Sequence, residues 1–419
     1  MLLPLWQKSH LFMQIIEVTA AATAKVWLEL PFTLYKGDEN WIPPLRQDIE
    51  KVFDPKRNKA WQFGEAVRWL LVDDTNTPIG RIAAFTNEKM SNPLDYPVGG
   101  VGFFECIDDQ QAANLLFDTA KEWLTTRGME GMDGPINFGE KNQFWGLLID
   151  NFTDPPTYGF NYNPRYYQSL FENYGFRVFY NQNVYYRTLA REAEERMQRK
   201  ARIIAERNKI TARNVKGLSI DAIADRFVKV YNGAWATHEG FKPMKKEQAD
   251  KIIRSMKAVM DPRIVIFAYH ENEPIGFFVN IPELNQVFKY VHGNLNWWGK
   301  LKFLYHKKFN PPRTMYGLVF GVVKEWQGKG AEAAMIQYAS DTIVANDWYE
   351  DLVMTWIGDF NPKMIHVIQQ VGGELYRQYA TYRFNFDPNR PFQRHPVVGR
   401  KEDNKKADSA ESASSSEEE

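Results

Sequence analysis

The sequence repeats one order of predicted elements, and this repeat restricts the fold more than any other feature of the chain. Hydrophobic periodicity predicts, in each half, a strand, two helices, a hairpin, a strand, a helix, a strand, a helix and two final strands. Asn163 and Gly175 are separated by the same interval as Asn361 and Gly373. A repeat of domain length indicates duplication and pseudo-symmetry. The sequence therefore predicts an α+β chain with two similar halves.

The predicted halves are joined by a charged segment. We expect a first half at 13–189, a linker helix at 190–208 and a second half at 209–388. The linker has few apolar residues, and its Glu and Arg residues recur at helical spacing, which is typical of a solvated helix. The tail at 400–419 is rich in Lys, Glu and Ser, so we expect it to be disordered.

Composition excludes several classes of protein. The formal net charge of the 419 residues is zero, which argues against binding nucleic acid through bulk charge. The single cysteine, Cys106, excludes an internal disulfide framework and fits a reducing, cytoplasmic compartment. Seven scattered histidines give no metal-ligand spacing, so no metal is expected. No apolar stretch reaches the roughly 18 residues of a membrane-spanning helix.

A strand, a glycine turn and a helix follow one another in the second half. The β-rich run 314–323 leads into a turn at 327–331, and a helical pattern covers 331–344. Two glycines let backbone N–H groups converge without obstruction by Cβ atoms. The helix N-terminus adds unpaired N–H groups at the positive end of its dipole. The segment therefore predicts a cradle for a diphosphate.

The turn Gln327-Gly328-Lys329-Gly330-Ala331 resembles the acyl-CoA pyrophosphate loop of the GNAT (Gcn5-related) N-acyltransferases. Gln327 and Gly330 match the family pattern, whereas Glu332 stands where the family has Gly or Ala. The element order is also that of a GNAT domain, so residues 13–388 resemble a tandem-GNAT protein. This resemblance implies mixed central sheets flanked by helices, and acetyl-CoA or a longer acyl-CoA as co-substrate. It implies that the cofactor-binding residues are Val322, Val323, Lys324, Gln327, Gly328, Lys329, Gly330, Ala331 and Asn361.

The first half lacks the glycine turn at the equivalent place. Its strand at 99–106 runs into Asp108 and Asp109, which cap a helix well but would repel a diphosphate. We therefore expect acyl-CoA in the second half only. The first half would then be a degenerate partner that shapes the acceptor cleft.

The resemblance does not supply a general acid. The family often has a tyrosine seven residues after the position of Asn361, and this chain has Ile368 there. Amine attack on a thioester needs a route for the proton, so a carboxylate or histidine is expected nearby. The candidates are Glu239 and His238, next to the second half's first two helices, together with Asp359 and His366. An ordinary surface or capping role remains the alternative for each.

Two segments carry chemistry outside this pattern. The loop at 134–150 is dense in glycines, amides and charges, as binding loops often are, although an ordered connection is equally expected. The insert at 295–309 mixes aromatic side chains with lysines. It can lie peripherally on the inner face of an anionic membrane, or it can pack its aromatics into the core between the halves.

The function expected from the resemblance is transfer of an acyl group from acyl-CoA to an amine acceptor. Loops such as Gly134-Pro-Ile-Asn are similar to those of bacterial ceramide synthase-like acyltransferases, which implies a long-chain sphingoid base as acceptor. One alternative is an acetyltransferase of a small polar or peptide amine. Another is a non-catalytic acyl-CoA-binding scaffold, suggested by Glu332 and Ile368.

Overall fold

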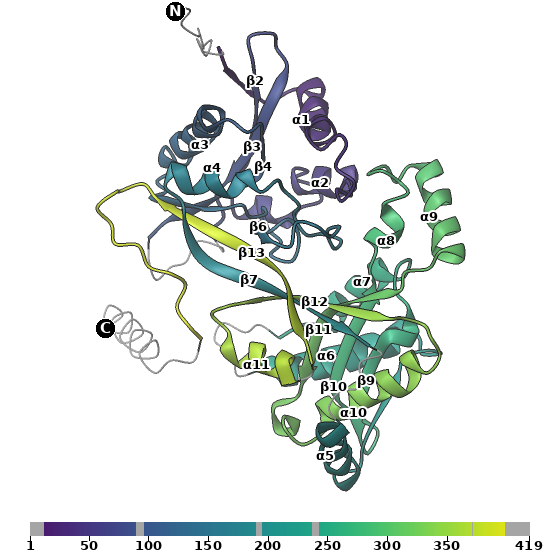
Figure 1. Ribbon diagram of the computed structural model, residues 1–419. Helices are drawn as coiled ribbons and strands as arrows, with labels where there is room; N and C mark the ends of the chain where they lie inside the picture. The colour runs from purple at the N-terminus through teal and green to yellow at the C-terminus, as the bar shows by residue number, and fades with distance from the viewer. Residues whose placement is uncertain (1–11, 89–95, 190–194, 237–242, 371, 399–419) are drawn as a thin grey trace, which may run out of the picture.

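The computed structural model describes residues 12–88, 96–189, 195–236, 243–370 and 372–398 (Figure 1). Within them, one continuous sheet runs in the order β1-β2-β3-β4-β5-β13-β7-β12-β11-β10-β9-β8, and β6 pairs with β13 beside this path. The strands are β1 (Gln14–Glu17), β2 (Ala66–Val72), β3 (Pro78–Phe85), β4 (Val98–Cys106), β5 (Gly131–Gly134), β6 (Leu147–Asp150), β7 (Arg177–Thr188), β8 (Ile210–Asn214), β9 (Val265–His270), β10 (Glu273–Pro282), β11 (Thr314–Val322), β12 (Asp351–Gly358) and β13 (Glu374–Asn385).

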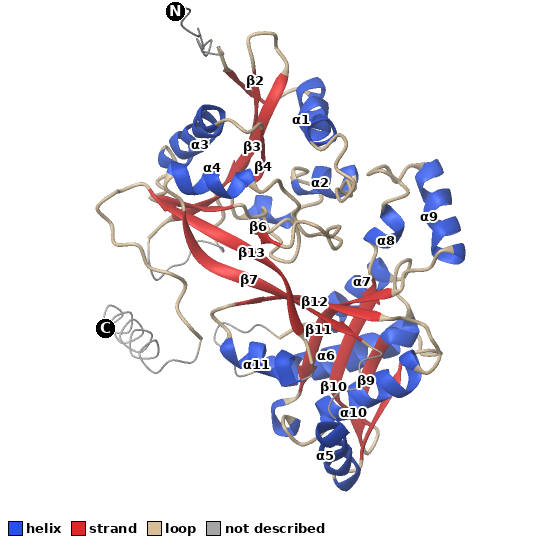
Figure 2. Cartoon of the chain, in the orientation of Figure 1, coloured by secondary structure: helices blue, strands red, loops and turns tan. Residues whose placement is uncertain are grey.

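Helices cover both faces of this sheet (Figure 2). They are α1 (Ala21–Leu34), α2 (Arg46–Val52), α3 (Gln110–Thr125), α4 (Tyr166–Tyr174), α5 (Glu195–Arg207), α6 (Ile220–Trp235), α7 (Lys246–Met256), α8 (Asn285–Phe288), α9 (Trp297–Phe309), α10 (Ala331–Ala339) and α11 (Pro362–Gln370). Capping residues set several of these ends. Asp109 accepts hydrogen bonds from the first turn of α3, and Gly175 ends α4 in the left-handed region at φ +112°.

The alternation of apolar side chains along the strands explains the two covered faces. In β9, Val265 and Phe267 pack with α6 and α7, whereas Ile266 and Ala268 pack with α10. In the first half, α1 and α2 cover one face and α3 and α4 the other. A separate apolar cluster fills the seam between the halves.

The two halves exchange their last strands. β13 pairs with β5 of the first half, with Tyr382 opposite Gly134 and Arg383 opposite Asp133. β7 pairs with β12 of the second half, and β7 and β13 pair with each other across the middle of the molecule (Figure 1). Arg383 donates two hydrogen bonds to the Asp133 carboxylate, Nε at 2.7 Å and Nη2 at 2.9 Å. Each half is therefore completed by a strand of the other.

The sequence prediction is wrong at a few elements. Each half ends in one long strand, β7 or β13, and not in two strands, because no turn interrupts the alternation. The loop at 134–150 contains the short strand β6, and the helix predicted at 331–344 changes to a π-helical turn at Ser340–Val344. The predicted tail at 400–419 lies outside the described residues.

Candidate functional site

The parallel strands β11 and β12 separate partway along their length. They pair from Thr314, opposite Asp351, to Gly317, opposite Met354. In the described strands this ladder goes no further, although β11 continues to Val322 and β12 to Gly358. Because the two strands diverge, a gap opens between neighbouring strands in the middle of the sheet.

A β-bulge lies where the strands begin to separate. Val279 of β10 is opposite Val319 of β11, but the next residue, Asn280, is opposite Gly317. Leu318 is therefore the extra residue of β11. A bulge bends its strand and leaves a backbone position outside the ladder, so it helps to direct β11 away from β12. This bulge could not be predicted from the sequence, because Leu318 continues an apolar run.

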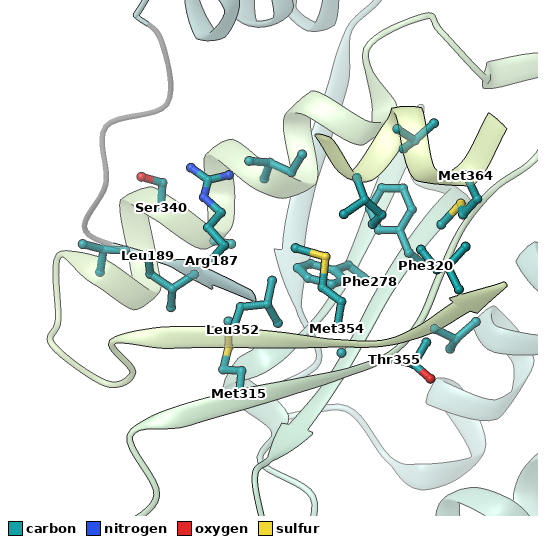
Figure 3. Close-up of a pocket in the computed structure, with 18 residues that line it drawn as sticks. Arg187, Leu189, Phe278, Met315, Phe320, Ser340, Leu352, Met354, Thr355 and Met364 are labelled. Carbon is teal, nitrogen blue, oxygen red and sulfur yellow. The ribbon is translucent and has the colours of Figure 1, made fainter. Parts of the chain in front are cut away.

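An apolar cavity of about 110 Å³ occupies the region of the separating strands. Figure 3 shows its side chains, which come mainly from β7, β10, β11, β12, α10, the π-helical turn after α10, and α11. Arg187 and Ser340 lie at one end, and Phe320 and Met364 lie at the other (Figure 3). The remaining lining is almost entirely apolar and comprises Leu189, Phe278, Met315, Gly317, Val319, Ile336, Ala339, Val344, Leu352, Met354, Thr355, Ile357, Val367 and Ile368. Such a lining suits an aliphatic chain.

The glycine turn has the backbone expected of an anion cradle. Gly328 and Gly330 have φ values of +70° and +102°, which glycine adopts without steric cost. Gly330 is the N-cap of α10, whose first N–H groups lack intrahelical acceptors by geometry. The Gln327 amide donates to the carbonyl of Val322 at 3.1 Å and ties the turn to the end of β11. Residues of α10 also line the cavity, so the glycine turn and the cavity are connected by this one helix.

Three contacts at this turn could not be predicted from the sequence. Glu332 Oε1 accepts a hydrogen bond from the N–H of Gly328 at 3.2 Å, so its carboxylate takes a donor that a diphosphate would use. Helix α5 lies against the turn, and a Cβ added to Gly330 would be 2.8 Å from the backbone nitrogen of Ala205. Asn208 also donates to the Lys329 carbonyl at 2.8 Å. The linker is thus packed on the predicted cradle.

The equivalent region of the first half is closed by its own backbone. β4 and β5 pair only from Val98 to Gly100, but the Ile136 N–H then donates to the Val101 carbonyl at 2.8 Å. The Ile136 carbonyl oxygen would be only 1.9 Å from a Cβ at Gly102. Asp109 caps α3 by accepting from Gln111 and Ala112. The sequence predicts an acyl-CoA site in the second half only, and the closed backbone of the first half is consistent with that prediction.

The structure places the predicted catalytic residues as follows. Glu239 and His238 lie outside the described residues. Asp359 follows β12 and accepts a hydrogen bond from Arg394 at 2.6 Å, and it is not part of the cavity lining.

Asn361 caps α11 by accepting from the N–H of Met364 at 3.2 Å. Ile368, at the position of the family tyrosine, is buried and lines the cavity.

The remaining predicted cofactor residues surround the turn. Val322 is in the core, and Gly233 of α6 lies close to the side chain of Val323. Lys324 and Lys329 are exposed beside the glycines, and Ala331 is buried in the first turn of α10. Among the described residues, no group of three or more His, Cys, Asp and Glu side chains is placed to hold a metal ion.

Helix α9 stands out from the second half (Figure 1), and most of its aromatic residues are exposed. Trp297 and Trp298 are 64% and 66% exposed, and Phe303 is the one aromatic residue of α9 that is buried, stacked on Phe288. Phe303 thus packs into the apolar cluster between the halves, as one alternative expected, whereas the other large aromatic side chains of the insert do not. No helix in the described ranges combines the length and the hydropathy that crossing a membrane requires.

No protein-family model matches the chain. A protein named bacterial ceramide synthase, from Caulobacter vibrioides, is 26% identical over 375 residues, which cover 88% of this chain and 97% of that protein. Protein YghO of Escherichia coli strain K12 is 24% identical over 371 residues, covering 85% and 92%. The chain is therefore similar over nearly its whole length to both of these proteins.

Solved structures with the same architecture are more distant in sequence. A tandem GNAT protein from the clavulanic acid biosynthesis pathway is 10% identical, with a TM-score of 0.51 over 90% of this chain and 100% of its own. A GCN5-related glucosamine N-acetyltransferase region of a fungal β-N-acetylglucosaminidase is 12% identical, with a TM-score of 0.53 over 89% of this chain and 38% of its own. The expected architecture is confirmed: the chain has the α+β fold of the tandem GNAT proteins.

Proposed function

We propose that this protein transfers an acyl group from acyl-CoA, bound in its second half, to the nitrogen of an amine. The observation that carries the proposal is the apolar cavity at the separation of β11 and β12, next to a helix that begins with the glycine turn. In this assignment the turn at 327–331 binds the diphosphate, and the apolar lining surrounds the pantetheine arm or the acyl chain.

The reaction needs few groups from the protein. The neutral amine attacks the thioester carbonyl carbon, so that a C–N bond forms and the C–S bond breaks. CoA leaves as a thiol after taking the proton that the nitrogen loses. The protein has to orient the thioester, exclude water and accept the proton of the incoming ammonium. The closed backbone of the first half supports a single acyl-CoA site.

The acceptor proposed is a long-chain amine of the sphingoid class. The similarity to a protein named bacterial ceramide synthase supports this choice, and so does the exposed aromatic surface of α9. An acetyltransferase of a small polar amine is the second candidate. A third candidate is an acyl-CoA-binding scaffold without turnover. The hydrogen bond from the Gly328 N–H to Glu332 favours it, because a carboxylate in the turn repels the diphosphate.

A turnover assay separates the three candidates. Acetyl-, palmitoyl- and hydroxyacyl-CoA are each incubated with sphinganine, with shorter alkylamines and with a panel of polar amines, and free thiol is measured. We expect kcat/KM to rise with acceptor length, because each buried CH₂ contributes about 0.8 kcal/mol. Equal rates for short and long amines would favour the polar acceptor. Binding of acyl-CoA without release of thiol from any pair would favour the scaffold.

We further propose that α9 holds the protein on an anionic lipid surface. Changing Trp297 and Trp298 to serine should lower the fraction bound to phosphatidylglycerol-containing liposomes tenfold or more, since an apolar side chain contributes about 1.5–3 kcal/mol on burial. Each lysine of α9 near the surface adds about 1 kcal/mol, so salt should also weaken binding. The measurement is liposome sedimentation.

The double variant should keep the melting temperature of the parent, because both indoles are mostly exposed. Phe303→Ala is the matched control on the same helix. It removes a buried ring, so it should lower stability by about 3–5 kcal/mol. If the parent protein does not sediment with liposomes, the lipid contact is wrong.

A further inference from the structure

The first half contains a cavity separate from the one assigned to acyl-CoA. It has a volume of about 80 Å³ and lies between α1, α2 and β4, under the loop that leads to α4. We call it the aromatic chamber. It is named after six aromatic residues of its lining, Trp41, Phe103, Phe144, Tyr158, Phe160 and Tyr162.

One wall of the aromatic chamber is polar and contains an ion pair. The Glu105 carboxylate accepts hydrogen bonds from Tyr35 at 2.7 Å, from Tyr167 at 2.9 Å and from Arg81 at 3.3 Å. Burial raises the pKa of Glu105, and the positive charge of Arg81 opposes that shift. Because Arg81 and Glu105 neutralise each other, this wall adds no net charge to the cavity.

Asp48, on α2, is a carboxylate of a different kind. It lines the aromatic chamber and also a wide cleft of about 820 Å³ between the halves. Its Oδ2 accepts a hydrogen bond from Tyr158 at 2.7 Å, and no ion pair to it is found among the described residues. Burial raises the pKa of Asp48, while the Tyr158 bond and the charges of Lys51 and Arg57 lower it. Lys51 and Arg57 act on Asp48 through space without an ion pair among the described residues, so a ligand cation can still pair with this half-buried carboxylate.

We propose that the aromatic chamber binds the ammonium group of the acyl acceptor and that Asp48 is its counter-ion. Aromatic rings and a carboxylate together match an organic ammonium, which gains both charge pairing and cation–π attraction. This inference rests on the proposed function, since it names where the acceptor of that reaction is held. The amine would then enter through the cleft that shares Asp48. The chamber's volume of about 80 Å³ limits its occupant to the head group of the amine.

Ring contacts connect the aromatic chamber to the two regions that the reaction needs. Tyr158 lies 5.2 Å from Phe288, which lies 5.4 Å from Phe303 of α9. Phe160 lies 6.0 Å from Tyr316 of β11, two residues before the bulge. The chamber is therefore positioned between the exposed aromatic helix and the strand that borders the acyl-CoA cavity.

The test compares Asp48→Asn with Glu50→Gln, a matched change of an exposed carboxylate on the same helix. Binding of dodecylammonium and of uncharged dodecan-1-ol, below their micellar concentrations, is measured by calorimetry for each full-length protein. We expect Asp48→Asn to weaken dodecylammonium binding tenfold or more and to leave dodecan-1-ol and CoA binding unchanged. Glu50→Gln should change none of the three. In turnover, Asp48→Asn should raise KM for the amine while KM for acyl-CoA stays constant.

A second variant separates charge from structure. Tyr158→Phe removes the hydrogen bond but leaves the carboxylate, so dodecylammonium binding should stay within about threefold of the parent. The proposal is overturned if the parent binds the alcohol as tightly as the ammonium, or if Tyr158→Phe loses as much affinity as Asp48→Asn. Failure of the proposed function looks different: no amine is acylated, while Asp48→Asn still weakens dodecylammonium binding selectively.

Discussion

Replacing Gly328 with aspartate is expected to weaken CoA binding about a hundredfold. The added carboxylate repels the diphosphate and removes one or two charge-assisted N–H contacts, a loss of about 3 kcal/mol. Both glycines have positive φ, so any side chain strains the turn, but Gly328 is the better one to change because a Cβ there meets no atom within 4 Å. A side chain at Gly330 would instead displace α5 through its contact with Ala205. Calorimetry with CoA gives the affinity.

Asp109→Asn is the control in the first half. It removes a negative charge at the helix that corresponds to α10, and asparagine still caps α3 well. CoA affinity should not change. If Asp109→Asn improves CoA binding and Gly328→Asp has no effect, then the first half holds the cofactor and the assignment to the second half is wrong.

Neither half is expected to fold when it is made alone. A fragment ending at residue 189 lacks β13, and with it the fully buried side chains of Tyr379, Ala380 and Tyr382. Loss of one buried aromatic side chain costs about 3–5 kcal/mol, and a whole domain is stable by only about 5–15 kcal/mol. Circular dichroism and gel filtration should show the fragments 12–189 and 209–398 to be unfolded or aggregated.

Co-expression of the two fragments should restore folding, because each supplies the strand that the other lacks. The pair should elute as one complex of the size of the whole chain. A monomeric first fragment with a cooperative melting transition would contradict this expectation. It would mean that β7 can take the place of β13 beside β5.

Much of the fold follows from local sequence rules. Asp109 and Gly175 end their helices as capping residues should, and the alternating strands have the expected positions. The exchange of β7 and β13 could not be predicted in this way. Both strands are 12 residues long and follow a similar helix and glycine, so local pattern does not say which copy pairs with β5. That choice depends on long-range packing, such as the Arg383–Asp133 pair.

The candidate site was predictable only in part. The glycine turn is contiguous in sequence, so its spacing alone is enough to predict a diphosphate cradle there. Asp48 gave no signal, because it is one carboxylate on an ordinary amphipathic helix. Its environment is formed by Tyr158, 110 residues away in sequence, and by a cleft between the halves. The Glu332 contact was likewise hidden, because sequence shows the residue but not the direction of its side chain.

The exchanged strands also bear on how such a chain can arise. Two identical half-length chains that swapped their last strands would make a closed twofold dimer with this strand order at its centre. Joining the two copies in one gene converts that dimer into a single polypeptide without altering any strand pairing. Once joined, the copies no longer have to stay identical, so one can keep the glycine turn while the other closes its gap with Ile136. Losing either copy would leave an open sheet edge, and such an edge promotes aggregation.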